Sequence, residues 1–301
     1  MQKLDRRDFL RVGASGAVAA AAGPALLTSC AHPREVVTGR PVTVTAGGGG
    51  YFAEAFGLDD DLIKRVLRAG LEKGGEFAEL FVQHRVGDYV GFEDGQVNRA
   101  YSSVDLGAGI RVLEGDQTGY AFTEELSERS LLAAASTAAA IASGSPRSAP
   151  EALRSVEMPR LYTTRRVWVE EPPRGKIGVV QRIGEKVLAG DPAVVKAGVH
   201  FSDQDEVILV ANSDGLRVED TRPMTFAYAT CVAEKDDRVE SNSYSLSGRY
   251  GPGVYTPERV DELAREAVSR TMLLFEARVP DAGEMPVVLA PATSGILLHE
   301  A

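Results

Sequence analysis

Short turn signals between runs of strand-forming residues constrain the fold of this chain more than any other feature. Asp94-Gly95, Gly115-Asp116 and Asp214-Gly215 each separate two runs rich in Val, Ile, Tyr, Phe and Thr. Asp and Gly tolerate the backbone angles that a tight hairpin loop requires. The pattern therefore predicts antiparallel strands joined by hairpins.

Helical periodicity flanks these runs twice. Helices are predicted over 58–74, 126–142, 176–189 and 257–276, the last with Thr256 as N-cap. The strands predicted between them cover 77–84, 89–93, 97–102, 107–113 and 118–122, then 195–202, 206–212, 216–220, 224–234 and 238–246. Both halves indicate an α+β fold of antiparallel meandering sheets flanked by helices. Residues 58–284 then form either two sub-units, 58–142 and 174–276, or one domain with two sub-sheets, with 143–159 as a Pro-containing linker or surface loop.

Composition limits the partners. With 33 Lys and Arg against 43 Asp and Glu, the net charge is −10, which argues against nucleic acid as a ligand. The acidic groups Asp203, Asp205, Glu206 and Asp236-Asp237 are interpreted as solvated turns. Cys231 is predicted to be a buried, inert thiol in a strand.

The first residues are typical of an export signal. Arg6 and Arg7 precede Phe-Leu and a mildly apolar Ala- and Gly-rich run, which resembles a twin-arginine translocation signal. Leu-Thr-Ser before Cys30 resembles a lipobox, so Cys30 is the predicted lipidation site, with a chance cysteine after an ordinary signal peptide as the alternative. Residues 1–30 are thus a predicted signal peptide and 31–57 a Gly- and Pro-rich tether. We expect a periplasmic or cell-surface lipoprotein anchored to a membrane surface.

The last residues contain a predicted strand, 285–290, and an apolar helix that carries His299 and Glu300. Gly-Ile-Leu-Leu-His-Glu-Ala at 295–301 resembles the start of the H-E-x-x-x-H motif of the TldD/PmbA family. The blocks Gly-Ile-Arg-Val at 109–112 and Thr-Gly-Tyr-Ala at 118–121 also resemble that family's N-terminal domain. The similarity covers about residues 58–301, and 285–301 would open a truncated metal-bearing domain.

The resemblance implies a zinc metallopeptidase that cleaves unfolded or flexible peptides, often in a homo- or hetero-oligomer with a TldD/PmbA-type subunit. It implies that His299 is a zinc ligand and Glu300 the general base. The family's second His lies five positions after the first and its cysteine ligand much later, so neither position exists in this sequence. A non-catalytic, membrane-tethered partner subunit is the alternative. His32, His84 and His200 have no metal-ligand spacing and are interpreted as structural or exposed.

Overall fold

The computed structural model describes residues 50–93, 95–142, 150–156, 166–278, 281–290 and 293–300. Arg6, Arg7, Cys30 and His32 lie outside these ranges, so the predicted signal, lipid site and most of the tether stay predictions. No helix within the described ranges is long and apolar enough to cross a membrane.

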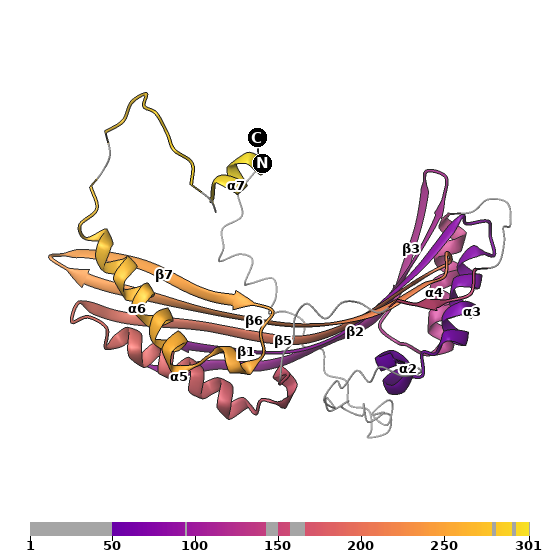
Figure 1. Ribbon diagram of the computed structural model, residues 1–301, viewed down its shortest axis with the longest axis horizontal. Coiled ribbons are helices and arrows are strands. Elements are labelled where there is room, and N and C mark those ends of the chain that lie inside the picture. The colour runs from indigo at the N-terminus through magenta and orange to yellow at the C-terminus, as the bar shows by residue number, and fades with distance from the viewer. Residues whose placement is uncertain are drawn as a thin grey trace, which may run out of the picture. The chain divides into compact units, whose positions relative to one another are not determined.

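Long antiparallel strands form one sheet of seven strands (Figure 1). Their order is β3-β2-β1-β5-β6, with β7 also paired to β6 and the short β4 parallel to β6. The bounds are β1 Phe77–Glu93, β2 Gln96–Glu114, β3 Gln117–Thr123, β4 Arg154–Ser155, β5 Val194–Asn212, β6 Leu216–Lys235 and β7 Arg238–Gly248. The predicted α+β class with an antiparallel, helix-flanked sheet is confirmed.

The described helices are α2 Gly50–Phe56, α3 Asp60–Leu71, α4 Glu128–Ile141, α5 Pro173–Leu188, α6 Pro257–Leu274 and α7 Thr293–Glu300, with 3-10 turns η1 Trp168–Glu170 and η2 Pro252–Val254. Three of these helices, α3, α4 and α6, begin where the sequence provides a capping side chain. The side chains of Asp59, Ser127 and Thr256 accept N-cap hydrogen bonds from the first turns of α3, α4 and α6. These bonds satisfy backbone N–H groups that have no partner inside the helix.

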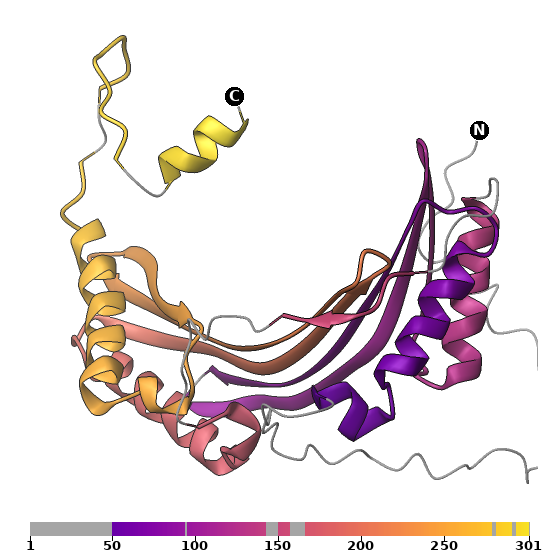
Figure 2. The same ribbon diagram turned by 45° about the vertical axis from the view of Figure 1, so that its right-hand side comes forward.

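Both helix pairs cover the same face of the sheet. Successive strand side chains alternate between faces, and the even residues of β1 from Ala78 to Phe92 and the odd residues of β5 from Ala197 to Ala211 point toward the helices. One apolar core lies under α3 and α4, and a second lies under α5 and α6 (Figure 2). The opposite side, which we call the open face, carries exposed aromatic side chains such as Tyr101, Tyr120 and Phe226.

The strands are longer than the sequence predicted. The pairs of strands predicted on either side of 85–88, 103–106, 203–205 and 221–223 are each one continuous strand. The sheet is therefore shared by both halves of the chain, and only the cores are separate. Short polar and glycine residues in these segments have low strand propensity, but pairing on both sides overrides it.

Two further expectations are corrected. The tether was predicted to reach residue 57, whereas residues 50–56 form α2, whose Phe52 is fully buried in the first core. Residues 285–290 were predicted to be a strand but form no regular structure, because no strand of the described part pairs with them.

The predicted turns hold. Glu93 pairs with Gln96, Glu114 with Gln117, and Gly215 lies at the β5–β6 junction with φ +87°. Asp236 and Asp237 join β6 to β7 with φ of 52° and 58°, which matches a type I′ hairpin.

Candidate functional site

The predicted metal-binding pair lies on α7. His299 and Glu300 occupy its last two positions, and both are exposed. The apolar residues before them, Ile296, Leu297 and Leu298, are also exposed, between 56% and 72%. The helix predicted around His299 is therefore present, while its role in metal binding stays a prediction.

The residues that the structure describes do not make a zinc site by themselves. A catalytic zinc ion takes three protein ligands and keeps one position open. Within the described ranges, no cluster of three or more His, Cys, Asp or Glu side chains could hold a metal ion. His299 supplies a single imidazole with one adjacent carboxylate. His299 and Glu300 could supply one zinc ligand and one general base of such a site. No catalytic step follows from these two residues alone.

The other predicted structural residues behave as expected. His84 is buried in β1, and its Nδ1 lies 2.5 Å from the Tyr51 hydroxyl of α2. Burial lowers the pKa of His84, which keeps the ring neutral near pH 7. Cys231 is fully buried in β6, and burial raises the pKa of its thiol. Cys231 is therefore an inert core residue, as predicted.

A row of polar side chains crosses the helix-covered face between the two cores. Strand register places Ser102 opposite Asp88, Asp88 opposite Asp203, and Asp203 opposite Thr225. All four share one face because directly paired residues point the same way. We call these four residues the polar row.

Lys176 from α5 lies over the polar row with its side chain 3% exposed. Its Nζ lies 2.6 Å from Asp88 Oδ2 and 2.9 Å from Asp203 Oδ1. The same ammonium lies 5.7 Å from the centroid of the Trp168 ring. Two carboxylates and an aromatic face thus compensate the desolvation of this buried cation.

Negative charge exceeds positive charge in this cluster. Asp205, two residues along β5, is also buried, and its Oδ2 accepts a hydrogen bond of 2.8 Å from the Val169 backbone N–H. Asp203 Oδ2 and Asp205 Oδ1 are buried with no hydrogen-bond partner among the described residues. Burial raises the pKa of Asp203 to about 7 against the opposing effect of Lys176, and it also raises the pKa of Asp205. The Asp203 carboxyl is therefore much less acidic than that of an exposed aspartate.

The interpretation of Asp203, Asp205 and Glu206 as a solvated turn was wrong. They lie within β5, and the two aspartates continue the alternation of buried odd positions from Ala197 to Ala211. That period of two was the sequence signal that could have identified them. Asp203 is part of a buried link between the sheet and α5, because Lys176 forms ion pairs with Asp88 of β1 and Asp203 of β5.

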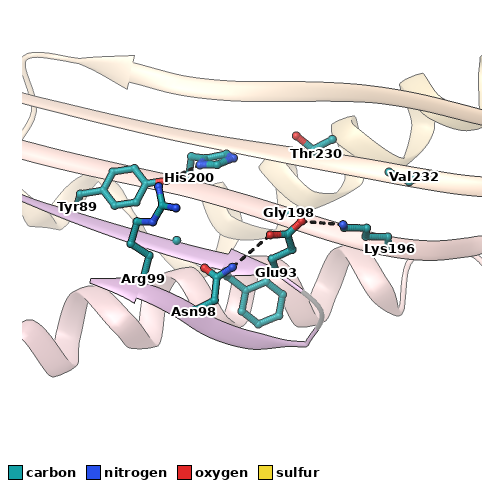
Figure 3. A pocket seen from close by; sticks show the side chains of 11 residues that line it. Tyr89, Glu93, Asn98, Arg99, Lys196, Gly198, His200, Thr230 and Val232 are labelled. Carbon is teal, nitrogen blue, oxygen red and sulfur yellow. Dashed lines mark hydrogen bonds and ion pairs between the residues drawn. The ribbon is translucent and has the colours of Figure 1, made fainter. Parts of the chain in front are cut away.

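The open face contains a recess above β1, β5 and β6 with a volume of about 250 Å³ (Figure 3). Gly91 and Gly198 contribute no side chains to it, while Tyr89, Arg99 and His200 stand around one end. The Tyr89 hydroxyl lies 2.5 Å from His200 Nδ1, and the Tyr89 ring stacks on Tyr101 at 5.0 Å. The prediction that His200 is structural or exposed holds for its exposure, but its position in a recess was missed.

The other end of the recess is an ion pair. Lys196 Nζ lies 2.7 Å from Glu93 Oε1, and Asn98 donates a hydrogen bond to the same carboxylate, as the dashed lines in Figure 3 show. The bond from Lys196 lowers the pKa of Glu93, so the carboxylate stays ionised. The pairing of β1 with β5 creates this recess, because it places Gly91 and Gly198 at neighbouring positions on an exposed face.

The fold and these sites define an α+β protein whose long sheet carries helices on one face and, in the described part of the chain, exposes aromatic side chains on the other. Its segments match two domain models: residues 78–142 the PmbA/TldA metallopeptidase domain 1, and residues 169–275 the PmbA/TldA metallopeptidase central domain. The chain belongs to the PmbA/TldD family.

Similar proteins agree with this assignment. A Haemophilus influenzae protein named Metalloprotease TldD homolog is 27% identical over 234 residues, covering 75% of this chain and 48% of its own length. A Methanothermobacter thermautotrophicus protein named Metalloprotease is 24% identical over 252 residues, covering 81% of this chain and 53% of its own. The chain thus spans about half the length of the curated relatives it matches.

Solved structures share the fold. TldE from Thermococcus kodakarensis superposes with a TM-score of 0.57 at 20% identity, covering 70% of this chain and 47% of that one. A Thermotoga maritima protein, described in connection with modulation of DNA gyrase, gives a TM-score of 0.59 at 17% identity over 74% of this chain and 50% of its own.

Proposed function

We propose that this chain contributes the N-terminal domains and the first metal ligand of a TldD-like zinc metallopeptidase that hydrolyses unfolded or flexible peptides. The proposal rests on the order of the domains and the last helix along the chain. Two consecutive metallopeptidase-family domains, 78–142 and 169–275, are followed by a helix that presents His299 beside Glu300. A neutral imidazole is a good zinc ligand, and a neighbouring carboxylate can act as a general base.

The remaining zinc ligands must come from residues that the structure does not describe. The curated relatives are about twice as long as the stretch they share with this chain, which leaves room for those ligands in a longer polypeptide. A homo- or hetero-oligomer with a TldD/PmbA-type subunit is part of the same proposal. The exposed apolar side chains of α7 support it, since such residues are covered in stable assemblies.

The test uses the full-length protein, purified without chelators, and measures bound zinc and cleavage of a flexible fluorogenic peptide. His299→Ala should lower both zinc content and cleavage. Glu300→Gln should keep the zinc but lower cleavage by roughly 10²-fold or more, the usual contribution of a general base. Glu284→Gln, an exposed carboxylate in the preceding segment, is the matched control. Unchanged cleavage in both test variants would reject the peptidase proposal.

The alternative function is a non-catalytic, membrane-tethered partner subunit. The scarcity of metal ligands among the described residues favours it. It predicts a protein without zinc or cleavage that nevertheless co-purifies with another subunit of the family. The zinc measurement on the unmodified protein separates the two functions.

We also propose export by the twin-arginine route and anchoring through Cys30, on the sequence evidence. Replacing Arg6 and Arg7 with Lys should retain the precursor in the cytoplasm, and Cys30→Ala should release the exported protein from the membrane fraction. Normal fractionation of both variants would reject this location.

A further inference from the structure

Two glycines on adjacent strands form the floor of the recess on the open face. Gly91 lies opposite His200 in the register, and Gly198 lies opposite Glu93, so two adjacent strands lack side chains at diagonal positions. A Cβ atom added at Gly198 would meet only Thr230, at 3.8 Å, which is ordinary van der Waals contact. The hollow therefore reflects missing side chains on a continuous sheet, and it can be filled without disturbing the backbone.

Arg99 brings an unneutralised cation to this hollow. It lies opposite Gly91 in β2, and because Gly91 has no side chain, the arginine leans across it toward Tyr89 and His200 (Figure 3). No carboxylate in the described part of the chain forms an ion pair with Arg99, whereas Arg85 and Arg111 on the same face are both paired. Lys196 is paired with Glu93, whereas Arg99 has no ion-pair partner among the described residues.

The surrounding groups select a planar anion. The guanidinium of arginine binds a carboxylate through two parallel hydrogen bonds. When the Tyr89 hydroxyl donates to His200 Nδ1, the proton of the imidazole lies on Nε2, which becomes a second donor. The hydroxyl of Thr230 lines the same hollow.

The neighbouring side chains favour a peptide over a small acid. Register places Tyr101, Tyr89, Ser202 and Phe226 in the adjacent row of the open face, and Tyr101 and Phe226 are 55% and 40% exposed. A volume of about 250 Å³ accommodates a carboxylate with its terminal residue, while these rings can contact the residues before it.

We propose that this recess binds the C-terminal carboxylate of an extended peptide, with Arg99 as the main anion-binding group. The proposal deepens the proposed peptidase function, since the ligand is the substrate or product class of that enzyme. It places peptide recognition on the open face, on elements separate from α7.

The experiment measures the affinity of the full chain for N-acetylated tetra-alanine by isothermal titration calorimetry, with the peptide as free acid and as C-terminal amide. The acid should bind at least about tenfold more tightly than the amide, and Arg99→Gln should remove that difference. Gly198→Val should weaken the binding of the free-acid peptide, because the valine side chain fills the hollow. Arg111→Gln is the matched control, because Arg111 lies on the same strand and face but is paired with Glu79, and it should bind like the unmodified chain.

Several outcomes would overturn the proposal. Equal binding of acid and amide, or an unchanged preference in Arg99→Gln, would exclude a carboxylate site. Inorganic phosphate or acetate that displaces the peptide at equal concentration would show a simple anion site. If a peptide amide with an internal glutamate binds as tightly as the free acid, the recess does not require a terminal carboxylate, and the proposal is rejected.

The variant His299→Ala distinguishes this inference from the peptidase proposal. If the variant still prefers the free acid but no longer cleaves peptides, binding in the recess is independent of the metal site and the inference is supported.

Discussion

At the scale of single residues, Lys176 is the most consequential side chain that sequence reasoning did not identify. It joins α5 to two strands through Asp88 and Asp203 at 2.6 and 2.9 Å. A buried ion pair is weak evidence for net stability, because desolvating both partners is costly. Its loss is costly for the same reason, since the remaining charges stay buried without a counterion.

Lys176→Met should therefore lower the free energy of unfolding by about 3–5 kcal/mol. The reason is that Asp203, with its side chain 2% exposed, loses its cation while Met fills the same volume. Urea denaturation followed by circular dichroism measures the change. Lys196→Met, which breaks the exposed pair with Glu93, should cost at most about 1 kcal/mol. Equal effects of the two substitutions would contradict this account of the buried cluster.

Asp203 should also make stability depend on pH. Its pKa is raised from the ordinary value of 3.8 to about 7 in the fold, so the folded chain binds more protons than the unfolded chain between these values. Stability from this carboxyl is thus fully present below about pH 4 and is lost as the pH rises to about 7. Asp203→Asn should flatten the dependence of the urea midpoint on pH between pH 5 and 7.5. A slope identical to that of the unmodified protein would assign the titration to other groups, such as Asp205.

At the scale of elements, the long strands explain several specific residues. Pro223 lies inside β6, where proline normally weakens a sheet. It does not interrupt the ladder with β7, because β7 ends at Gly248 opposite Thr225. The sequence predicted separate strands over 216–220 and 224–234, and only the pairing with β5 showed that the strand continues through Pro223.

Gly119 allows α4 to pack closely against β3. A Cβ atom at this position would lie 1.9 Å from the backbone oxygen of Ala138, so helix and strand approach as closely as they do only because Gly119 has no side chain. Gly119→Ala should destabilise the protein by about 1–3 kcal/mol, the usual cost of overpacking. Thermal unfolding measures the effect. Gly95→Ala is no suitable control, because Gly95 has a positive φ of 78°.

A matched control is Gly198→Ala, also in a strand, where the added atom meets only Thr230 at 3.8 Å. This variant should unfold within about 0.5 kcal/mol of the unmodified protein. Comparable losses at both glycines would mean that strand propensity, and not the contact with α4, decides the effect.

At the scale of the whole described sheet, two apolar cores share the strands β1 and β5. Leu80 and Leu209 lie in the first core, whereas Phe92 and Phe201 of the same strands lie in the second. Each of these strands is one continuous ladder that packs against both cores. We therefore expect the two cores to unfold together, although a polar row separates them.

Trp168 allows this to be tested, because it is the single tryptophan of the chain and lies buried in the second core. Leu80→Ala removes packing only from the first core and should cost about 2–5 kcal/mol. The Trp168 fluorescence midpoint in urea should shift by the same amount as the circular dichroism midpoint. A fluorescence midpoint that stays in place while circular dichroism becomes biphasic would show two independent units.

The sequence by itself determined the elements whose signals are local. Caps such as Asp59 and Thr256, the Asp-Gly turns and the apolar stripes of the helices depend on residues a few positions apart. The same locality made the helix around His299 predictable. The assignment to the family also followed from short blocks of residues, and the domain matches confirm it.

Only the tertiary structure decided which polar residues are buried and which glycines shape a surface. Asp88, Lys176 and Asp203 are far apart in the chain, and strand register and helix packing bring them within hydrogen-bond distance. Gly91 and Gly198 likewise become one floor through the pairing of β1 with β5. Local propensity describes the Asp and Gly residues of these strands as turn formers, because it contains no term for the partner that long-range pairing supplies.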